Sequence, residues 1–503
     1  MARVAEIYLL SNPLSPKQNE TILFNSTTEQ RTYMHGRTKH AYNNLSIQRQ
    51  NNTIKVPSYI DDIIDCNYIM FRNTSNGKWY YCFVVGFEYI NDNCTEITFK
   101  IDPLQTYQFN YTVKPCFVER EHVNDDSIGA NTIDEGLAIG ETTLIDKEVI
   151  TGMTNFRYII ATTYGTELHD DVVPKKYRGV LRNGIYSSLQ MLVFDNSQID
   201  DMVTLINDIE EKKEGAIQYI AVVPSFALSS SQVDGNIVYQ SNNCPSKDIT
   251  IPFSHSSING YTPKNNKLFC YPYNTLLISN SNGVQNLLKF ENFSNRNSIT
   301  FRFFGNLGAN CSVKMCPRNY KNVDTNFEEA LSIEGYPQCE FTTSNFKNWL
   351  YSSFMNVGAN FLTTALQMYT GNVWGTIQGG INTMQNGLNT LLKSDNVKGN
   401  STTALTSLLA KSDFKFYHQQ IKYEYARALD EYFTRYGYRV NRVKTPNHTG
   451  RNSFNYIKTQ NCLCHGDVPA KYLEEIQTIY DNGVVFWHDV ENFGNYTIDN
   501  SII

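Results

Sequence analysis

Short runs of β-branched and aromatic residues, separated by turn clusters, dominate the first third of the chain. Residues 78–90 read KWYYCFVVGFEYI, residues 91–93 are Asn-Asp-Asn, and residues 95–102 alternate between apolar and polar positions up to Pro103. Alternation with a period of two is typical of a half-buried strand, and Asn and Asp favour turns. The pattern therefore predicts a β-hairpin, and residues 142–164 have the composition of a further strand region.

The middle of the chain mixes strands with helix. An amphipathic helix is predicted over residues 197–213, where apolar residues recur at helical spacing. The polar, acidic and turn-rich stretch 124–140 predicts an exposed connection. Short strands bounded by Asn, Ser and Gly turns are predicted at residues 221–223, 235–239, 274–278, 287–293 and 298–304.

Helical spacing returns after residue 400. Apolar residues recur three or four positions apart among charged ones, which predicts one amphipathic helix that ends near Gly437. The residues of this stripe are Phe414, Tyr417, Ile421, Tyr425, Ala428, Leu429 and Tyr432.

A second C-terminal helix is predicted over residues 468–481. Asp467 is placed as its N-cap, Pro469 falls in its first turn and Gly483 stands at its C-terminal stop. Residues 484–487 then predict a closing strand.

These elements together predict an α+β fold that is predominantly β. An aromatic content of 13% beside only 18% charged residues favours strands and extensive subunit contact. Because 503 residues exceed what one hydrophobic core usually organises, the chain is expected to fold into two to four domains or one large discontinuous body. We predict an N-terminal β-rich part (1–150), a middle α+β part (151–345), an uncharged glycine-rich insertion (346–412) and a C-terminal segment that returns to the body (413–503).

Charge and cysteine usage exclude some classes of protein. A net charge of −6 argues against a nucleic-acid binder that neutralises phosphates. The apolar stretch Ile7 to Leu10 is too short for a secretory signal, so the chain is expected to be made in the cytosol. Eleven scattered cysteines in such a chain predict reduced structural thiols rather than a disulfide framework.

The most unusual feature is the insertion, because residues 348–392 contain no Asp, Glu, Lys, Arg or Pro. Apolar residues follow one another at intervals of four and lay a stripe along a predicted helix. Gly371, Gly375 and Gly379 form a small-xxx-small spacing that lets helical backbones approach closely. The stripe consists of Val357, Phe361, Ala365, Tyr369, Val373, Ile377 and Ile381.

This insertion is not a conventional membrane span, since Asn, Gln and Thr interrupt every window of about 20 residues. Three interpretations remain: a helical hairpin buried in a soluble core or subunit interface, a segment that enters a bilayer conditionally, and a disordered stretch. The second is possible because neutral polar side chains cost much less to desolvate than charges. In the second interpretation the membrane-contacting residues are Trp349, Phe354, Val357, Phe361, Leu362, Leu366, Tyr369, Val373, Trp374, Ile377, Ile381 and Leu388.

Motifs that organise catalysis are missing from the sequence. No Gly-x-Ser-x-Gly, Walker-type, His-Glu-x-x-His or Gly-x-Gly-x-x-Gly pattern occurs in a suitable context. The Cys462-Leu463-Cys464-His465 run lacks the usual Cys-x2-Cys geometry of zinc sites and is interpreted as a strand edge. The adjacent acids Asp125-Asp126 are interpreted as solvated surface. We predict no catalytic residue, no metal site and no cofactor.

Several stretches resemble the tail-knob proteins of phi29-like short-tailed phages. The resemblance extends over most of the chain, and the uncharged insertion falls where that family carries a long hydrophobic loop. The matching stretches are residues 101–121, 264–283, 432–446, 451–459, 482–487 and 494–496.

The resemblance implies a homohexameric tube at the distal tip of a virion tail, attached to a proximal tail or collar protein. Six loops would plug the lumen and later enter the host cytoplasmic membrane to form a pore for DNA. An acidic wall is consistent with DNA that slides without sequence-specific contacts. The alternative is a receptor-binding or cell-wall-hydrolysing tail tip protein.

Overall fold

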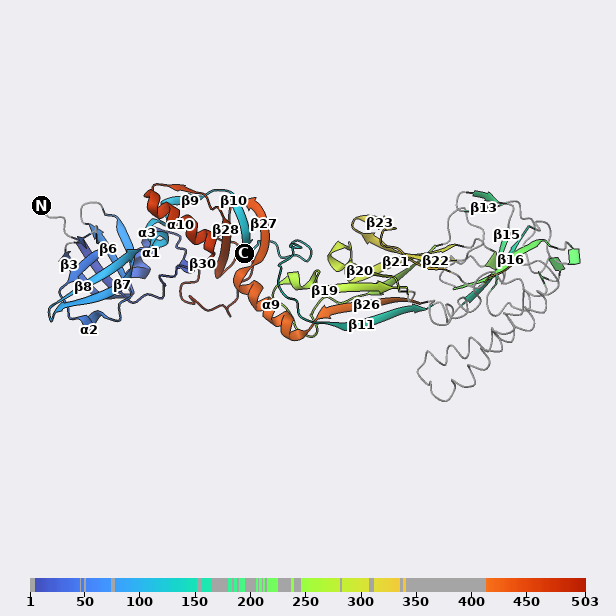
Figure 1. Cartoon of the computed structure of the whole chain (residues 1–503), viewed down its shortest axis with the longest axis horizontal. Coiled ribbons are helices and arrows are strands. Elements are labelled where there is room, and N and C mark those ends of the chain that lie inside the picture. Colours follow the sequence, from blue (N-terminus) through green and yellow to red (C-terminus); the bar gives the residue numbers. More distant parts are fainter. Residues whose placement is uncertain are drawn as a thin grey trace, which may run out of the picture. The chain divides into compact units, whose positions relative to one another are not determined.

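The computed structural model describes two compact units, each assembled from separated stretches of the chain (Figure 1). Unit 1 comprises residues 1–138, 263–268 and 424–503, and unit 2 comprises residues 139–262 and 269–423. The predicted four-part division of the chain stays a prediction. The described residues are 5–45, 47–48, 51–73, 77–151, 156–163, 180–182, 185–187, 190–194, 205–206, 208–209, 211–212, 215–224, 237–238, 246–280, 283–306, 312–334, 338–340 and 413–503.

Unit 1 begins with a seven-stranded antiparallel sheet in the order β3-β1-β6-β7-β8-β5-β4. It curls into a half-barrel in which β3 approaches β5. The predicted hairpin is confirmed as β7 and β8, which pair antiparallel along their length. The strands are β1 (Ala5–Leu10), β3 (Thr38–Leu45), β4 (Ile47–Gln48), β5 (Thr53–Val56), β6 (Tyr68–Asn73), β7 (Trp79–Asn91) and β8 (Cys94–Ile101).

The apolar run Ile7–Leu10 of strand β1 is covered on both faces of the sheet. Ile7 and Leu9 are buried in a core on one side, and Leu10 belongs to a second core that also contains Trp487. At the start of the strand, the partly exposed Glu6 pairs with Arg72. Short helices α1 (Thr27–His35), α2 (Ile60–Ile63) and α3 (Pro103–Tyr107) accompany this sheet.

A second sheet of unit 1 joins N-terminal and C-terminal stretches in the order β2-β30-β28-β10-β27. Its strands pair antiparallel except β2 and β30, which are parallel. The predicted closing strand is confirmed as β30. The strands are β2 (Glu20–Ile22), β10 (Cys116–Glu121), β27 (Tyr438–Lys444), β28 (Phe454–Gln460) and β30 (Val484–Trp487).

Helix α10 (Ala470–Asn482) confirms the second C-terminal helix but corrects its start. Pro469, not Asp467, is the N-cap, because the chain stays extended in the strand β29 (Cys464–Gly466) and leaves it only at Asp467. Gly483 does end the helix, with a φ of 91° that glycine adopts without strain. Strand β29 pairs with β9 (Tyr111–Val113), so the Cys462–His465 run lies at a strand edge as predicted.

Unit 2 contains a sandwich of two antiparallel sheets. One has the order β11-β26-β19-β20, and the other consists of β18, β21, β22, β23 and β24. Phe416 and Phe414 of β26 pack on Phe301 and Phe303 of β21, with ring centroids 4.7 and 5.4 Å apart. The strands are β11 (Thr142–Thr151), β18 (Ser246–Pro252), β19 (Asn274–Ser279), β20 (Gln285–Lys289), β21 (Ser298–Asn306), β22 (Ser312–Tyr320), β23 (Val323–Thr325), β24 (Leu331–Glu334) and β26 (Asp413–Ile421).

A third sheet of unit 2 has the order β17-β15-β12-β16-β25, and β13 pairs with β14 beside it in the chain. Of the helix predicted over residues 197–213, the residues that the structure describes are helical. The strands are β12 (Phe156–Thr162), β13 (Val180–Arg182), β14 (Ile185–Ser187), β15 (Gln190–Phe194), β16 (Ile217–Pro224), β17 (Ile237–Val238) and β25 (Gln338–Glu340).

The helix predicted to begin near Phe414 is wrong in its first half. Residues 413–421 form β26, whose buried positions alternate, and the helix α9 runs only over Tyr423–Tyr436. The aromatic residues on the outer face of β26, such as Tyr417, produced the false spacing of four. Similarly, the strand predicted over 287–293 ends at Lys289, and Phe290–Asn292 form a 3₁₀ turn.

Several antiparallel sheets and few helices thus make up the described part of the chain, which confirms the predominantly β prediction. Within these residues, no helix is both long enough and apolar enough to cross a bilayer.

Candidate functional site

The predicted membrane-contacting residues and the three helix-packing glycines lie at positions 349–388, outside the described residues. Their assignment therefore stays a prediction. The structure does place the strands that flank the insertion. β25 ends at Glu340 and β26 begins at Asp413, and both strands belong to unit 2. The uncharged stretch is thus inserted within a single unit.

A buried ion network lies in unit 1, inside the stretch that was predicted to be an exposed connection. Most of residues 124–140 are exposed, but Glu135 is buried, with only 1% of its side chain accessible. Its carboxylate accepts hydrogen bonds from Lys267 Nζ and Arg120 Nη2, and from the backbone amide of Arg439 at 3.0 Å. Three donors, two of them cationic, compensate the desolvation of this carboxylate.

The same region holds the short segment 263–268, which is flanked on both sides by residues of unit 2. Asp430 accepts the backbone amides of Lys264 and Asn265, both at 3.0 Å, and Asp126 accepts the amide of Asn266 at 3.0 Å. Burial raises the pKa of Asp126. These carboxylates bind backbone amides of segment 263–268, so the cluster holds this segment within unit 1. Their hydrogen bonds are used for structure, and none of them is placed for acid or base catalysis.

The prediction that Asp125 and Asp126 are both solvated is correct for Asp125 and wrong for Asp126. Asp125 is exposed and accepts the Ser127 amide at 2.9 Å, whereas Asp126 points inward to Tyr438. Adjacent residues on an irregular segment face different environments because their side chains diverge. The sequence alone carried no signal for this difference.

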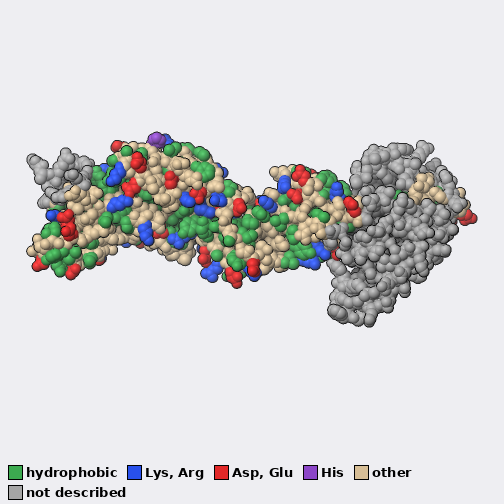
Figure 2. Space-filling model, viewed as in Figure 1, with side chains coloured by type: hydrophobic (Ala, Val, Ile, Leu, Met, Phe, Trp, Pro, Cys, Tyr) green, Lys and Arg blue, Asp and Glu red, His purple; other side chains and the backbone are tan. Residues whose placement is uncertain are grey.

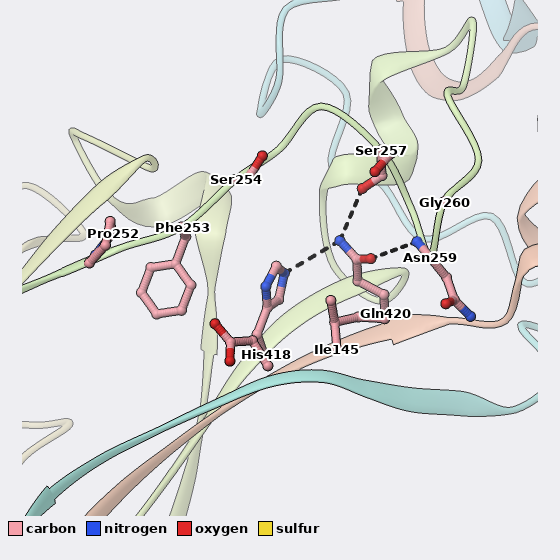
Figure 3. Close-up of a pocket in the computed structure, with 10 residues that line it drawn as sticks. Ile145, Pro252, Phe253, Ser254, Ser257, Asn259, Gly260, His418 and Gln420 are labelled. Carbon is pink, nitrogen blue, oxygen red and sulfur yellow. Dashed lines mark hydrogen bonds between the residues drawn. The ribbon is translucent and has the colours of Figure 1, made fainter.

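A cleft of about 480 Å³ opens in unit 2 (Figure 3). Its floor is formed by His418 and Gln420 of β26, and one wall consists of Pro252 at the end of β18 and the loop 253–260 that follows it. The opposite side comes from a β-bulge in β11, where the pairing register with β26 shifts between Leu144 and Asp146. Bulges re-aim side chains, and here Ile145 and Asp146 line the cleft.

The imidazole of His418 belongs to a buried polar chain. Its Nε2 donates to Asn274 Oδ1 at 2.7 Å, Asn274 Nδ2 donates to His255 Nδ1 at 3.1 Å, and His255 Nε2 donates to the Arg296 carbonyl at 2.9 Å. Burial, reinforced by the neighbouring His255, lowers the pKa of His418 to about 4. Burial also lowers the pKa of His255, so both imidazoles are neutral at pH 7.

Acidification is expected to destabilise unit 2 through His418. A pKa that is lower in the folded state than the usual 6.5 means that the unfolded chain binds the proton first, so stability is complete above pH 6.5 and is lost as the pH falls toward 4. The loss by pH 4 is roughly 3 kcal/mol. Thermal unfolding between pH 7.5 and 4.5 should show a smaller pH slope for His418→Gln than for the same substitution at exposed His465. Equal slopes in the two variants would contradict the assignment.

Cys462 and Cys464 are both buried, and their sulfur atoms lie 3.7 Å apart without a disulfide between them. Burial raises the pKa of Cys116 to about 11 beside them. Thiols held in the protonated form are poor nucleophiles and poor metal ligands. In the described ranges, no group of three or more His, Cys, Asp or Glu residues is arranged to hold a metal ion.

Basic and acidic side chains are interspersed over the described residues on the face shown in Figure 2. This face therefore has no large patch of one charge sign. An example of mixed charge is the exposed ladder of unit 2 in which Asp248 pairs with Arg302 at 2.7 Å and with Arg318 at 2.6 Å. Mixed charge of this kind does not concentrate phosphates.

Comparison with known proteins places this fold among the tail proteins of tailed bacteriophages. Residues 4–112, which contain the half-barrel, match the family described as caudoviral major tail protein N-terminus. Residues 239–501 match the family of the C-terminal domain of the Bacillus phage phi29 tail knob protein gp9. The chain belongs to this tail knob protein family, and it is accordingly a structural component of the phage tail and of the virion.

Individual relatives agree over nearly the full chain. The tail knob protein gp9 of Bacillus phage phi29 is 27% identical, covering 89% of this chain and 90% of its own. That of Bacillus phage PZA is 26% identical, covering 97% of both. The solved structure of the bacteriophage C1 tail knob protein gp12 has a TM-score of 0.65 and 16% identity, and the match covers 99% of this chain and 100% of that one. The last similarity concerns the fold.

Proposed function

We propose that this tail knob protein forms the wall of a homohexameric tube at the distal tip of the tail, attached to a proximal tail or collar protein. DNA passes through the tube without sequence-specific contacts. The net charge of −6 supports this role, because a chain with more acidic than basic residues does not retain DNA phosphates by charge neutralisation. The tube is consistent with membership of the tail knob family.

We further propose that the segment 346–412, which contains the uncharged stretch 348–392, plugs the lumen and then penetrates the host cytoplasmic membrane during genome ejection. The observation that carries this proposal is the absence of ionic side chains and proline from residues 348–392 in a chain of ordinary charge density. Neutral amides and hydroxyls can line a shared aqueous lumen while the apolar stripe contacts lipid. Its position between two strands of one unit supports release of the segment while the β-sheets stay folded.

Cryo-electron microscopy of the purified protein, combined with a liposome assay, tests both halves. We expect closed rings of six subunits, and release of an encapsulated dye from anionic liposomes by the same preparation. A monomeric particle would contradict the tube. Rings that release no dye at any pH or lipid composition would contradict the membrane role alone.

The comparisons do not support the receptor-binding alternative, but the cleft in unit 2 offers a place where a small group could bind.

A further inference from the structure

The floor of the cleft in unit 2 is polar, although it lies on the inward-facing side of a sandwich strand, where apolar residues are expected. The inward-facing positions of β26 are Phe414, Phe416, His418 and Gln420, so the series changes from aromatic to polar where the sandwich opens. His418 and Gln420 are 4% and 2% exposed. Burying an imidazole and an amide is costly unless each is hydrogen-bonded, and both are. The cleft is therefore a built feature and not a packing gap.

Gln420 also fixes the wall of the cleft. Its Oε1 accepts the backbone amide of Asn259 at 2.7 Å, and its Nε2 donates to the Ser257 carbonyl at 3.2 Å (Figure 3). The backbone at Asn259 and Gly260 has positive φ values of 47° and 83°, and a Cβ atom on Gly260 would meet nothing within 4 Å. The side chain of Gln420 thus fixes the position of the loop 253–260, and its hydrogen bonds to the loop backbone serve this purpose.

The lining restricts the charge of a ligand. Among the ten described residues that line the cleft there is no Lys or Arg, and Asp146 is the one carboxylate. The neighbouring Lys147 lies over the ring of Tyr417, on the other face of the sheet. His418 adds no charge at neutral pH. An anion such as a phosphate would find no cationic partner here and would be repelled by Asp146.

The remaining lining combines apolar and hydrogen-bonding surface. Ile145, Pro252 and Phe253 offer an apolar side, and Asp146, Ser254 and Asn259 offer acceptors and donors beside it. A pyranose ring has the same division, with a C–H face and equatorial hydroxyls, and the cleft volume lies within the usual range for small-molecule sites. We propose that this cleft binds an uncharged pyranoside, such as a sugar unit of a cell-surface glycan. The proposal goes beyond the tube and membrane roles and does not depend on them.

Saturation-transfer difference NMR with the full-length protein tests this inference. The probes are methyl β-D-glucopyranoside, N-acetylglucosamine and, as the charged counterpart, glucose 6-phosphate. We expect saturation transfer to at least one neutral sugar with a Kd on the order of 1 mM, and at least tenfold weaker transfer to the phosphate. No transfer to either neutral sugar at 10-fold that concentration would overturn the proposal.

Three variants test the location of the site. Ser254→Trp places a large ring on the exposed rim and should remove the signal, whereas Ser294→Trp, on an exposed loop of the same unit outside the cleft, should preserve it. Asp146→Lys should reverse the preference toward glucose 6-phosphate. A signal that survives Ser254→Trp, or a preference unchanged by Asp146→Lys, would place binding elsewhere. Ring assembly and dye release are measured in the same preparations, so failure of sugar binding is distinguishable from failure of the proposed function.

Discussion

Deletion of Ser352 to Leu392 is expected to abolish dye release from liposomes while leaving ring assembly intact. The deleted stretch contains the whole apolar stripe and all three spaced glycines, and both flanking strands lie outside it. The strands of the described sheets keep their partners, because none of their pairings involves a deleted residue. Subunit number by electron microscopy and dye release from the same sample provide the measurement.

Two single substitutions test whether the apolar stripe itself contacts lipid, because they leave the rest of the segment in place. Ile377→Asp puts a carboxylate on the apolar stripe, at a cost of about 3 kcal/mol in each copy at the bilayer centre, which corresponds to at least a 100-fold reduction in release. Gln378→Asp introduces the same group on the neutral side of the predicted helix and should reduce release much less. Equal activity of the two variants would contradict the stripe, and release by the deletion variant would refute the role of the segment.

The second large effect is expected from Glu135→Gln in unit 1. This substitution leaves Lys267 Nζ, whose side chain is 2% exposed, and the guanidinium of Arg120 without their carboxylate partner. Removing one member of a buried ion network costs about 3–5 kcal/mol, because the remaining charge stays desolvated. Chemical denaturation followed by tryptophan fluorescence, in a background in which Trp349 and Trp374 are replaced by Phe, reports on unit 1, where Trp79 and Trp487 lie.

The matched control is Glu119→Gln. Glu119 pairs with Lys458 at 2.9 Å, but both side chains are partly exposed, and pairs of this kind contribute at most about 1 kcal/mol. Lys267→Met should reproduce the loss seen with Glu135→Gln. If the buried and surface substitutions shift the midpoint equally, the network does not anchor the segment 263–268.

Local pattern was sufficient for elements whose signal is contained within a few residues. The β7–β8 hairpin follows from alternation and an Asn-Asp-Asn turn, and the end of α10 follows from Gly483. Local pattern gave the wrong element at β26. Aromatic residues on both faces of a strand fit the spacing of a helix as well as the alternation of a strand. Pairing of β26 with β11 on one side and β19 on the other resolves that ambiguity.

The sites depended on contacts that are distant along the chain. Glu135 meets Lys267 across 132 positions, and the cleft combines residues near 145, 255 and 419. A polar loop residue has no local signature of burial, because burial is set by partners that the tertiary fold brings to it. The inward turn of Asp126 and the polar floor of the cleft were invisible for the same reason.

By itself, the sequence determined that this protein is rich in strands, that it resembles tail-knob proteins, and that one long segment has been stripped of ionic groups. These properties depend on local composition and on short stretches of sequence, so they do not require knowledge of the folded structure. The tertiary structure alone decided which stretches share a unit, which carboxylates are buried and where a ligand-sized cleft opens. Those properties depend on desolvation and hydrogen bonding between residues far apart in the chain, and only the folded arrangement specifies them.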